Sequence, residues 1–184
     1  LVWLPRLAAG SAVHKLLASA ADRLAETSPQ EIHRLLRLSE SEALPAAIHL
    51  CGRLKLQPAV PGLAETLGHA AAPVRLAGVQ ALDAIGTPGA LQGLERALDD
   101  ADRDVRIAGV QAMGRHGYKG ALRRIEPVVQ GKVTRDIDLT ERMRFFEAYA
   151  MIAGPSALES LAAMLAVGGL FKRKESPEVR ACAA

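Results

Sequence analysis

Aromatic side chains are scarce in this 184-residue chain, where they make up only 3% of the sequence. Strands favour aromatic and β-branched side chains, and binding of unpaired bases relies on aromatic stacking. The composition therefore disfavours a β-sandwich and a base-stacking protein. Alanine and leucine are abundant instead, and small residues let helices approach one another closely. The composition predicts an all-α protein with enough residues for one good core.

Cysteines and long apolar runs are also few. Cys51 and Cys182 are far apart and form no C-x-x-C motif, and each falls on an apolar helical face. Buried thiols in a reduced, cytoplasmic chain are the natural interpretation. The longest apolar run, Leu161 to Phe171, has about half the length that a bilayer requires. We therefore expect no membrane association.

The residue patterns of common catalytic sites are missing as well. The five histidines form no pair at the i, i+4 spacing that places two metal ligands on one helix face. The chain has no Walker loop and no G-x-S-x-G motif. The acids between Asp99 and Asp104 suit a helix N-terminus better than a calcium loop. We expect no catalytic residue, no metal site and no cofactor.

An internal repeat dominates the middle of the sequence. VRLAGVQALDAIG begins at Val74 and VRIAGVQAMGRHG begins at Val105, an offset of 105 − 74 = 31 residues. A fixed offset near 30 with helical patterning indicates a stacked repeat array. Each copy places small and apolar residues on one helix face, closes on Gly86 or Gly117, and continues into a second apolar helix. One unit is therefore predicted to be a helix pair that is stabilised by its neighbours.

The remaining sequence fits further units of the same kind. A degenerate unit lies before residue 39, and another spans Ala43 to Gly68. After the two central copies, an apparent insertion at residues 130–140 precedes a helix that starts near Glu141. That helix is expected to carry Met143, Phe145, Phe146, Tyr149, Ala150 and Ile152 on its apolar face, and a helix over Ala157 to Val167 follows it.

The motif restarts at Glu178-Val179-Arg180, at 179 − 105 = 74 residues after the second copy. We expect one domain over residues 1–184 with about five helical hairpins, the last of which is truncated at Ala184. The chain is then expected to be part of a longer protein or to be completed by another copy. A truncated repeat exposes an apolar end, so self-association is a further expectation.

The repeated unit resembles the HEAT repeat, and in particular the short HEAT-like repeat of phycobilin lyases. The openings Pro73-Val74-Arg75 and Asp104-Val105-Arg106 and the run from Ala77 to Gly86 carry the resemblance. It implies an α-solenoid, an α-α superhelix of the armadillo-like type, with a binding role. The HEAT-repeat hydroxylase with paired His-Glu iron motifs is excluded, because no His-Glu dipeptide occurs here.

Positive charge is concentrated in residues 103–144. The net charge of this segment is 10 − 5 = +5, whereas that of the remaining chain is 3 − 5 = −2. The basic residues are Arg103, Arg106, Arg115, Lys119, Arg123, Arg124, Lys132, Arg135, Arg142 and Arg144, and the acids are Asp104, Glu126, Asp136, Asp138 and Glu141.

The resemblance implies that second helices line a concave face and that the turns form one rim. On that geometry Arg115 and Lys119 lie on the rim, and Arg123 and Arg124 begin a second helix. Lys172, Arg173 and Lys174 form another basic loop. These seven residues are the candidate partner-binding set for a protein or peptide with an acidic surface. The alternative is a set of basic turns that only keeps the protein soluble.

Three functions remain after this comparison of residues and patterns. The first is a non-catalytic protein-protein interaction scaffold, which the resemblance implies. The second is a nucleic-acid-binding HEAT-like solenoid, disfavoured by the few aromatics and the small net charge. The third is a bilin lyase or chaperone, for which no residue here can be assigned a role.

Overall fold

The computed structural model describes residues 23, 27–28, 36–37, 44–132, 137–165 and 181–183. All regular structure in these residues is helical, which confirms the predicted all-α class. The chain divides into two compact units, residues 1–96 and residues 97–184. The expected helix from Leu7 to Ala25 lies almost wholly outside the described residues. The expectation of a single domain with about five hairpins stays a prediction.

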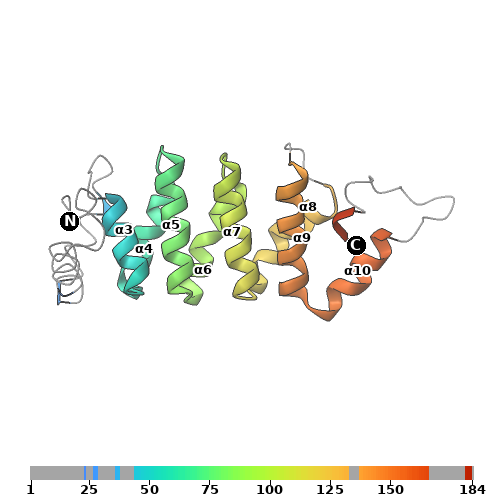
Figure 1. Cartoon of the computed structure of the whole chain (residues 1–184). Coiled ribbons are helices and arrows are strands. Elements are labelled where there is room, and N and C mark those ends of the chain that lie inside the picture. Colours follow the sequence, from blue (N-terminus) through green and yellow to red (C-terminus); the bar gives the residue numbers. More distant parts are fainter. Residues whose placement is uncertain are drawn as a thin grey trace, which may run out of the picture. The chain divides into compact units, whose positions relative to one another are not determined.

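The first unit contains two helix pairs. In the first pair, α3 (Leu44–Arg53) is followed by the 3-10 turn η2 (Gln57–Ala59) and by α4 (Val60–Thr66). In the second pair, α5 (Ala72–Ile85) is followed by α6 (Pro88–Leu94). Helix α3 packs on α5, and α4 packs on both α5 and α6 (Figure 1). The first helices are therefore stacked on each other, and the second helices likewise.

Small residues bring the stacked helices of this unit into close contact. A Cβ atom added to Gly52 on α3 would lie 2.8 Å from the Cα atom of Ala81 on α5. Ile48, Leu63 and Leu82 fill the surrounding core and are fully buried. Such packing needs a glycine where two backbones meet, because interiors are close-packed and leave no room for another methyl group.

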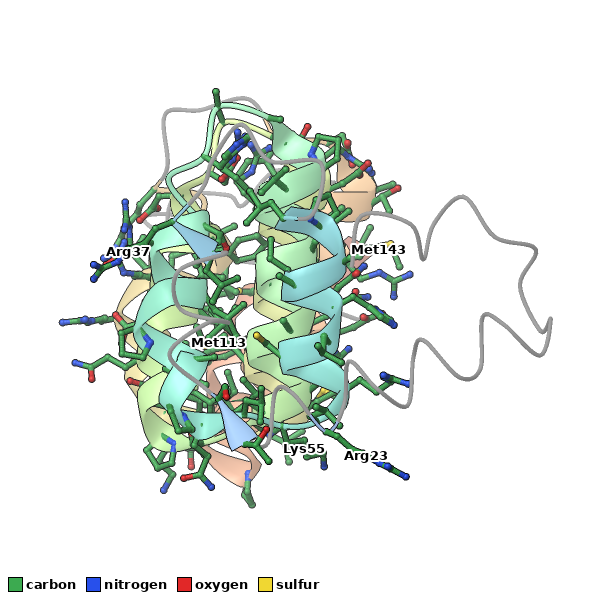
Figure 2. All side chains as sticks on the ribbon, turned by 90° about the vertical axis from the view of Figure 1, so that its left-hand side faces the viewer. Arg23, Arg37, Lys55, Met113 and Met143 are labelled. Carbon is green, nitrogen blue, oxygen red and sulfur yellow. The ribbon has the colours of Figure 1, made fainter. Side chains whose placement is uncertain are left out.

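The second unit repeats the arrangement with longer connections. The 3-10 turn η3 (Glu95–Asp99) leads into it, and α7 (Arg103–Arg115), η4 (Lys119–Ala121) and α8 (Leu122–Val129) form its first helix pair. Helices α9 (Leu139–Ala153) and α10 (Pro155–Leu165) form the next pair, and α9 packs on α7, α8 and α10. Met113 is fully buried and points between the helices (Figure 2).

The predicted helix ends are confirmed at several positions. Gly86 ends α5 in the left-handed conformation with φ of 64°, and Gly117 has φ of 59° after α7. The Asp102 side chain caps α7 by accepting hydrogen bonds from the backbone N–H groups of Asp104, at 2.9 Å, and Val105, at 3.1 Å. The turn residues of the sequence therefore set the lengths of the repeated helices.

The last helix pair differs from the prediction in detail. Helix α9 begins at Leu139, two residues early, because the Asp138 side chain caps it through the backbone N–H of Glu141. Helix α10 begins at Pro155, directly after Gly154. Met143 and Ala150 were placed with the core-facing residues of α9, and this was wrong because both are exposed. Figure 2 shows Met143 at the outer edge of the helices.

Candidate protein-interaction surface

An arginine in the repeated Val-Arg opening has a structural role in both described copies. The Nη1 atom of Arg75 donates to the carbonyl oxygens of residues 69 and 70, at 2.9 and 3.0 Å. The Nη1 atom of Arg106 donates to the carbonyl oxygens of residues 100 and 101, at 2.8 and 2.9 Å. Each arginine thereby ties the first turn of its helix to the preceding turn, with every partner shifted by 31 residues.

Arg106 also forms a buried ion pair with Glu141. Its Nε and Nη2 atoms donate to Oε1 and Oε2 of Glu141, both at 2.6 Å, and the two side chains are 9% and 1% exposed. The hydrogen bonds to Glu141 raise the pKa of Arg106. This bidentate pair joins α7 to α9 and fixes how the two helices are aligned.

A second, exposed pair lies at the N-terminal ends of the same helices. Arg103 donates to the carboxylate of Asp138 and also contacts Asp104, with the Nη1 and Oδ1 atoms 3.1 Å apart. The Arg103 hydrogen bonds and the backbone N–H of Glu141 lower the pKa of Asp138 to about 2. Asp138 is therefore both the cap of α9 and a partner of α7.

The remaining basic residues of this region gather at the turn between α7 and α8. The sequence from Val105 to Ile125 contains no aspartate or glutamate. Arg115 ends α7, Lys119 begins η4 and Arg123 lies in the first turn of α8, and all three residues are exposed. We call these three residues the basic turn.

The ring of Tyr118 gives this turn a defined surface. Tyr118 is half-buried, and a Cβ atom added to Gly120 would lie 2.6 Å from the Cζ atom of its ring. The glycine therefore allows the ring to lie against the backbone between Lys119 and the start of α8. A fixed turn that carries three cations and no anion presents positive charge at low entropic cost to a bound partner.

Arg124 is placed differently from the other predicted binding residues. It forms an ion pair with Asp99, and its side chain is 36% exposed. It occupies the position that Gly62 and Gly93 hold in the two earlier units. Gly93 lies against α4, since an added Cβ would be 3.3 Å from the Cβ of Ala64. At position 124 the larger side chain reaches an acid of its own unit instead.

Lys172, Arg173 and Lys174 lie outside the described residues. The structure instead reveals a group that the sequence prediction missed, namely Arg103, Arg106, Asp138 and Glu141. The recurrence of arginine after valine at positions 75 and 106 was the available signal for Arg106. Four of the ten basic residues of the charged segment are engaged in ion pairs, namely Arg103, Arg106, Arg124 and Arg144.

Other kinds of site were sought in the same residues. In the described ranges, no group of three or more His, Cys, Asp or Glu side chains is arranged to hold a metal ion. No helix in the part of the chain that the structure describes combines the length and apolarity needed to cross a membrane. Burial raises the pKa of the Cys51 thiol to about 12, so this cysteine stays protonated and is a poor nucleophile.

The stacked helix pairs and their 31-residue register define an α-helical repeat protein. Comparison with family models gives the same result more specifically, because the model of the HEAT repeats matches residues 28–114. This part of the chain belongs to the HEAT-repeat family. A comparison with curated proteins finds no match.

Proposed function

We propose that this protein is a non-catalytic interaction scaffold that binds an acidic protein or peptide through the basic turn. The observation that carries the proposal is the exposure of Arg115, Lys119 and Arg123 on one structured turn without an acid between Val105 and Ile125. HEAT repeats typically serve as protein-interaction scaffolds, and the match over residues 28–114 supports that role here. The buried thiol of Cys51 is compatible with a reducing, cytoplasmic setting.

Electrostatics would set the specificity of this surface. Charged residues at an exposed surface accelerate encounter with an oppositely charged partner and disfavour partners of like charge. Arg124 contributes less to the proposed contact than the basic turn does, because Asp99 already neutralises it. An acidic loop or helix end that meets Arg115, Lys119 and Arg123 together is the partner chemistry that fits.

Affinity capture from nuclease-treated lysate tests the proposal. The test bait carries Arg115→Glu, Lys119→Glu and Arg123→Glu, and the control bait carries Arg53→Glu, Lys55→Glu and Arg96→Glu. Both baits undergo the same change in net charge at exposed positions. We expect the wild-type and control baits to retain a protein that the basic-turn variant loses. Arg124 is left unchanged because a glutamate there would face Asp99 and disturb the fold.

Two outcomes would contradict the proposal. Equal recovery of all partners by the three baits would show that the basic turn contributes only to solubility. Recovery of nucleic acid without any protein from untreated lysate, lost in the basic-turn variant, would favour the nucleic-acid function instead. Circular dichroism of each bait confirms that the substitutions have left the helices intact.

A further inference from the structure

The face of α7 that receives α9 has a counterpart on α9 itself. Asp102 caps α7 and Asp138 caps α9, so equivalent positions of the two helices are 138 − 102 = 36 residues apart. The face of α7 consists of residues that contact α9 or lie between such residues on one helical stripe. It comprises Arg103, Arg106, Ile107, Val110 and Gly114, and the equivalent stripe on α9 comprises Leu139, Arg142, Met143, Phe146 and Ala150. We call this second stripe the outer face of α9.

On α7 the contacts of this stripe are well defined. Arg103 and Arg106 bind Asp138 and Glu141, respectively. At the other end of α7, a Cβ atom added to Gly114 would lie 3.1 Å from the Cα atom of Ala148. The two helices are therefore parallel, and each residue of the first turn of α7 pairs with the residue 35 positions later.

On α9 the same stripe is largely uncovered. Leu139 is 51% exposed and Met143 is 46% exposed, and Ala150 is exposed where its counterpart Gly114 is buried. Arg142, at the position of Arg106, is half-buried. Only Phe146 is buried to the same degree as its counterpart. Two large apolar side chains beside an arginine on one helix face indicate a docking surface.

We propose that the outer face of α9 is the docking site for a further first helix, which residues 177–183 of this chain form. This extends the α7–α9 interface by one step. Glu178-Val179-Arg180 repeats the Val-Arg opening of α7 at an offset of 74, so Ser176 corresponds to the caps Asp102 and Asp138. The pairing seen between α7 and α9 then places Ser176 at Leu139 and Val179 at Arg142.

Charge and position both support this occupant. Glu178 would bring an acid into the first turn of the docking helix, beside Arg142, as Glu141 lies beside Arg106. The described turn Ala181–Ala183 is helical, and Ala183 is 7% exposed. In Figure 1 this turn lies on the side of α9 away from α7.

Cross-linking within the full chain tests the pairing. The test variant combines Leu139→Cys with Ser176→Cys, and the matched control combines Arg144→Cys with Ser176→Cys. Arg144 lies about 140° around the helix from Leu139. Cys182→Ser removes the half-buried native thiol, and Cys51 stays because it is fully buried. With a short bismaleimide, we expect an intramolecular link at least about tenfold faster in the test variant than in the control. Mass spectrometry of tryptic fragments identifies it.

Equal linking rates in the two variants would overturn the proposal, and so would links that form mainly between two molecules. A second readout does not depend on the engineered pair. Met143→Cys should be alkylated several-fold faster when Val179→Asp is also present, whereas Glu147→Cys should react at an unchanged rate. An unchanged rate at position 143 would also contradict the docking of residues 177–183 on α9.

Discussion

Gly109 determines how closely α7 can approach the segment that precedes it. A Cβ atom at this position would lie 2.9 Å from the Cβ of Ala97 and 3.6 Å from the Cδ2 of Leu98. Gly109→Leu should therefore lower the free energy of unfolding by at least about 1–3 kcal/mol through overpacking. Thermal and urea melts monitored by circular dichroism measure this loss. Gly89→Ala is the control, because nothing lies within 4 Å of its added Cβ, and it should not destabilise the chain. A wild-type melting temperature for Gly109→Leu would show that the packing surface is wrongly assigned.

The Arg106–Glu141 pair is the other residue-scale determinant. Removal of one partner leaves the second charge buried without compensation, so Arg106→Ala or Glu141→Ala should each cost about 3–5 kcal/mol. The double variant Arg106→Met with Glu141→Leu should lose less than the sum of the two single substitutions, because it leaves no buried charge. Urea unfolding of all variants completes the cycle. Additive losses would mean that the two side chains act independently, in conflict with their bidentate contact.

At the scale of the element, Asp138 links the start of α9 to pH. Its pKa in the folded protein is about 2, below the ordinary value of 3.8. The folded state therefore favours the charged carboxylate, and the stabilising contribution is complete above about pH 4. It is lost as the pH falls through about 2. Asp138→Asn keeps a capping side chain but removes this titration, so its melting temperature should depend less on pH between pH 4 and pH 2.

The control for this titration is Glu159→Gln on α10, an exposed substitution of the same kind. Its melting temperature should follow that of the wild-type chain throughout the pH range. If Asp138→Asn and the wild-type chain lost stability in parallel below pH 4, the Arg103–Asp138 pair would not be responsible for the pH dependence.

The sequence predicts some elements well because their signals are local. The helices α5 and α7 follow from small and apolar residues at helical spacing, and Gly86 marks the end of α5 by its need for a positive φ. The contact between Arg106 and Glu141 was not predicted, because its partners are 35 residues apart and an insertion lies between them. The exposure of Met143 was missed for a related reason, since periodicity identifies an apolar face but not its occupant.

For the candidate site, the sequence predicted the location of the positive charge but not its partners. Arg115, Lys119 and Arg123 lie on the predicted turn and helix start. That Arg124 binds Asp99 depends on the position of η3, which no local pattern indicates. Side-chain pairing between turns is decided by how helix pairs stack, and one repeat unit does not encode that distance.

At the scale of the whole molecule, charge and stacking have separate roles. Arginines of the Val-Arg openings hold the helix pairs together within each unit, as Arg75 and Arg106 show. The basic turn lies at the end of a helix pair, away from these structural contacts. The scaffold hypothesis therefore predicts that neutralising the basic turn alters binding but not stability, whereas substitution of Arg106 alters stability.

The most direct test of the scaffold hypothesis is the dissociation constant between the purified chain and the principal protein captured with it, measured by calorimetry. For the variant with Arg115→Glu, Lys119→Glu and Arg123→Glu, we predict binding at least about tenfold weaker than for wild type, a free-energy change of roughly 1.4 kcal/mol or more. The control variant with Arg53→Glu, Lys55→Glu and Arg96→Glu should bind within about twofold of wild type. Equal dissociation constants for all three proteins would contradict the assignment of the basic turn as the interaction surface.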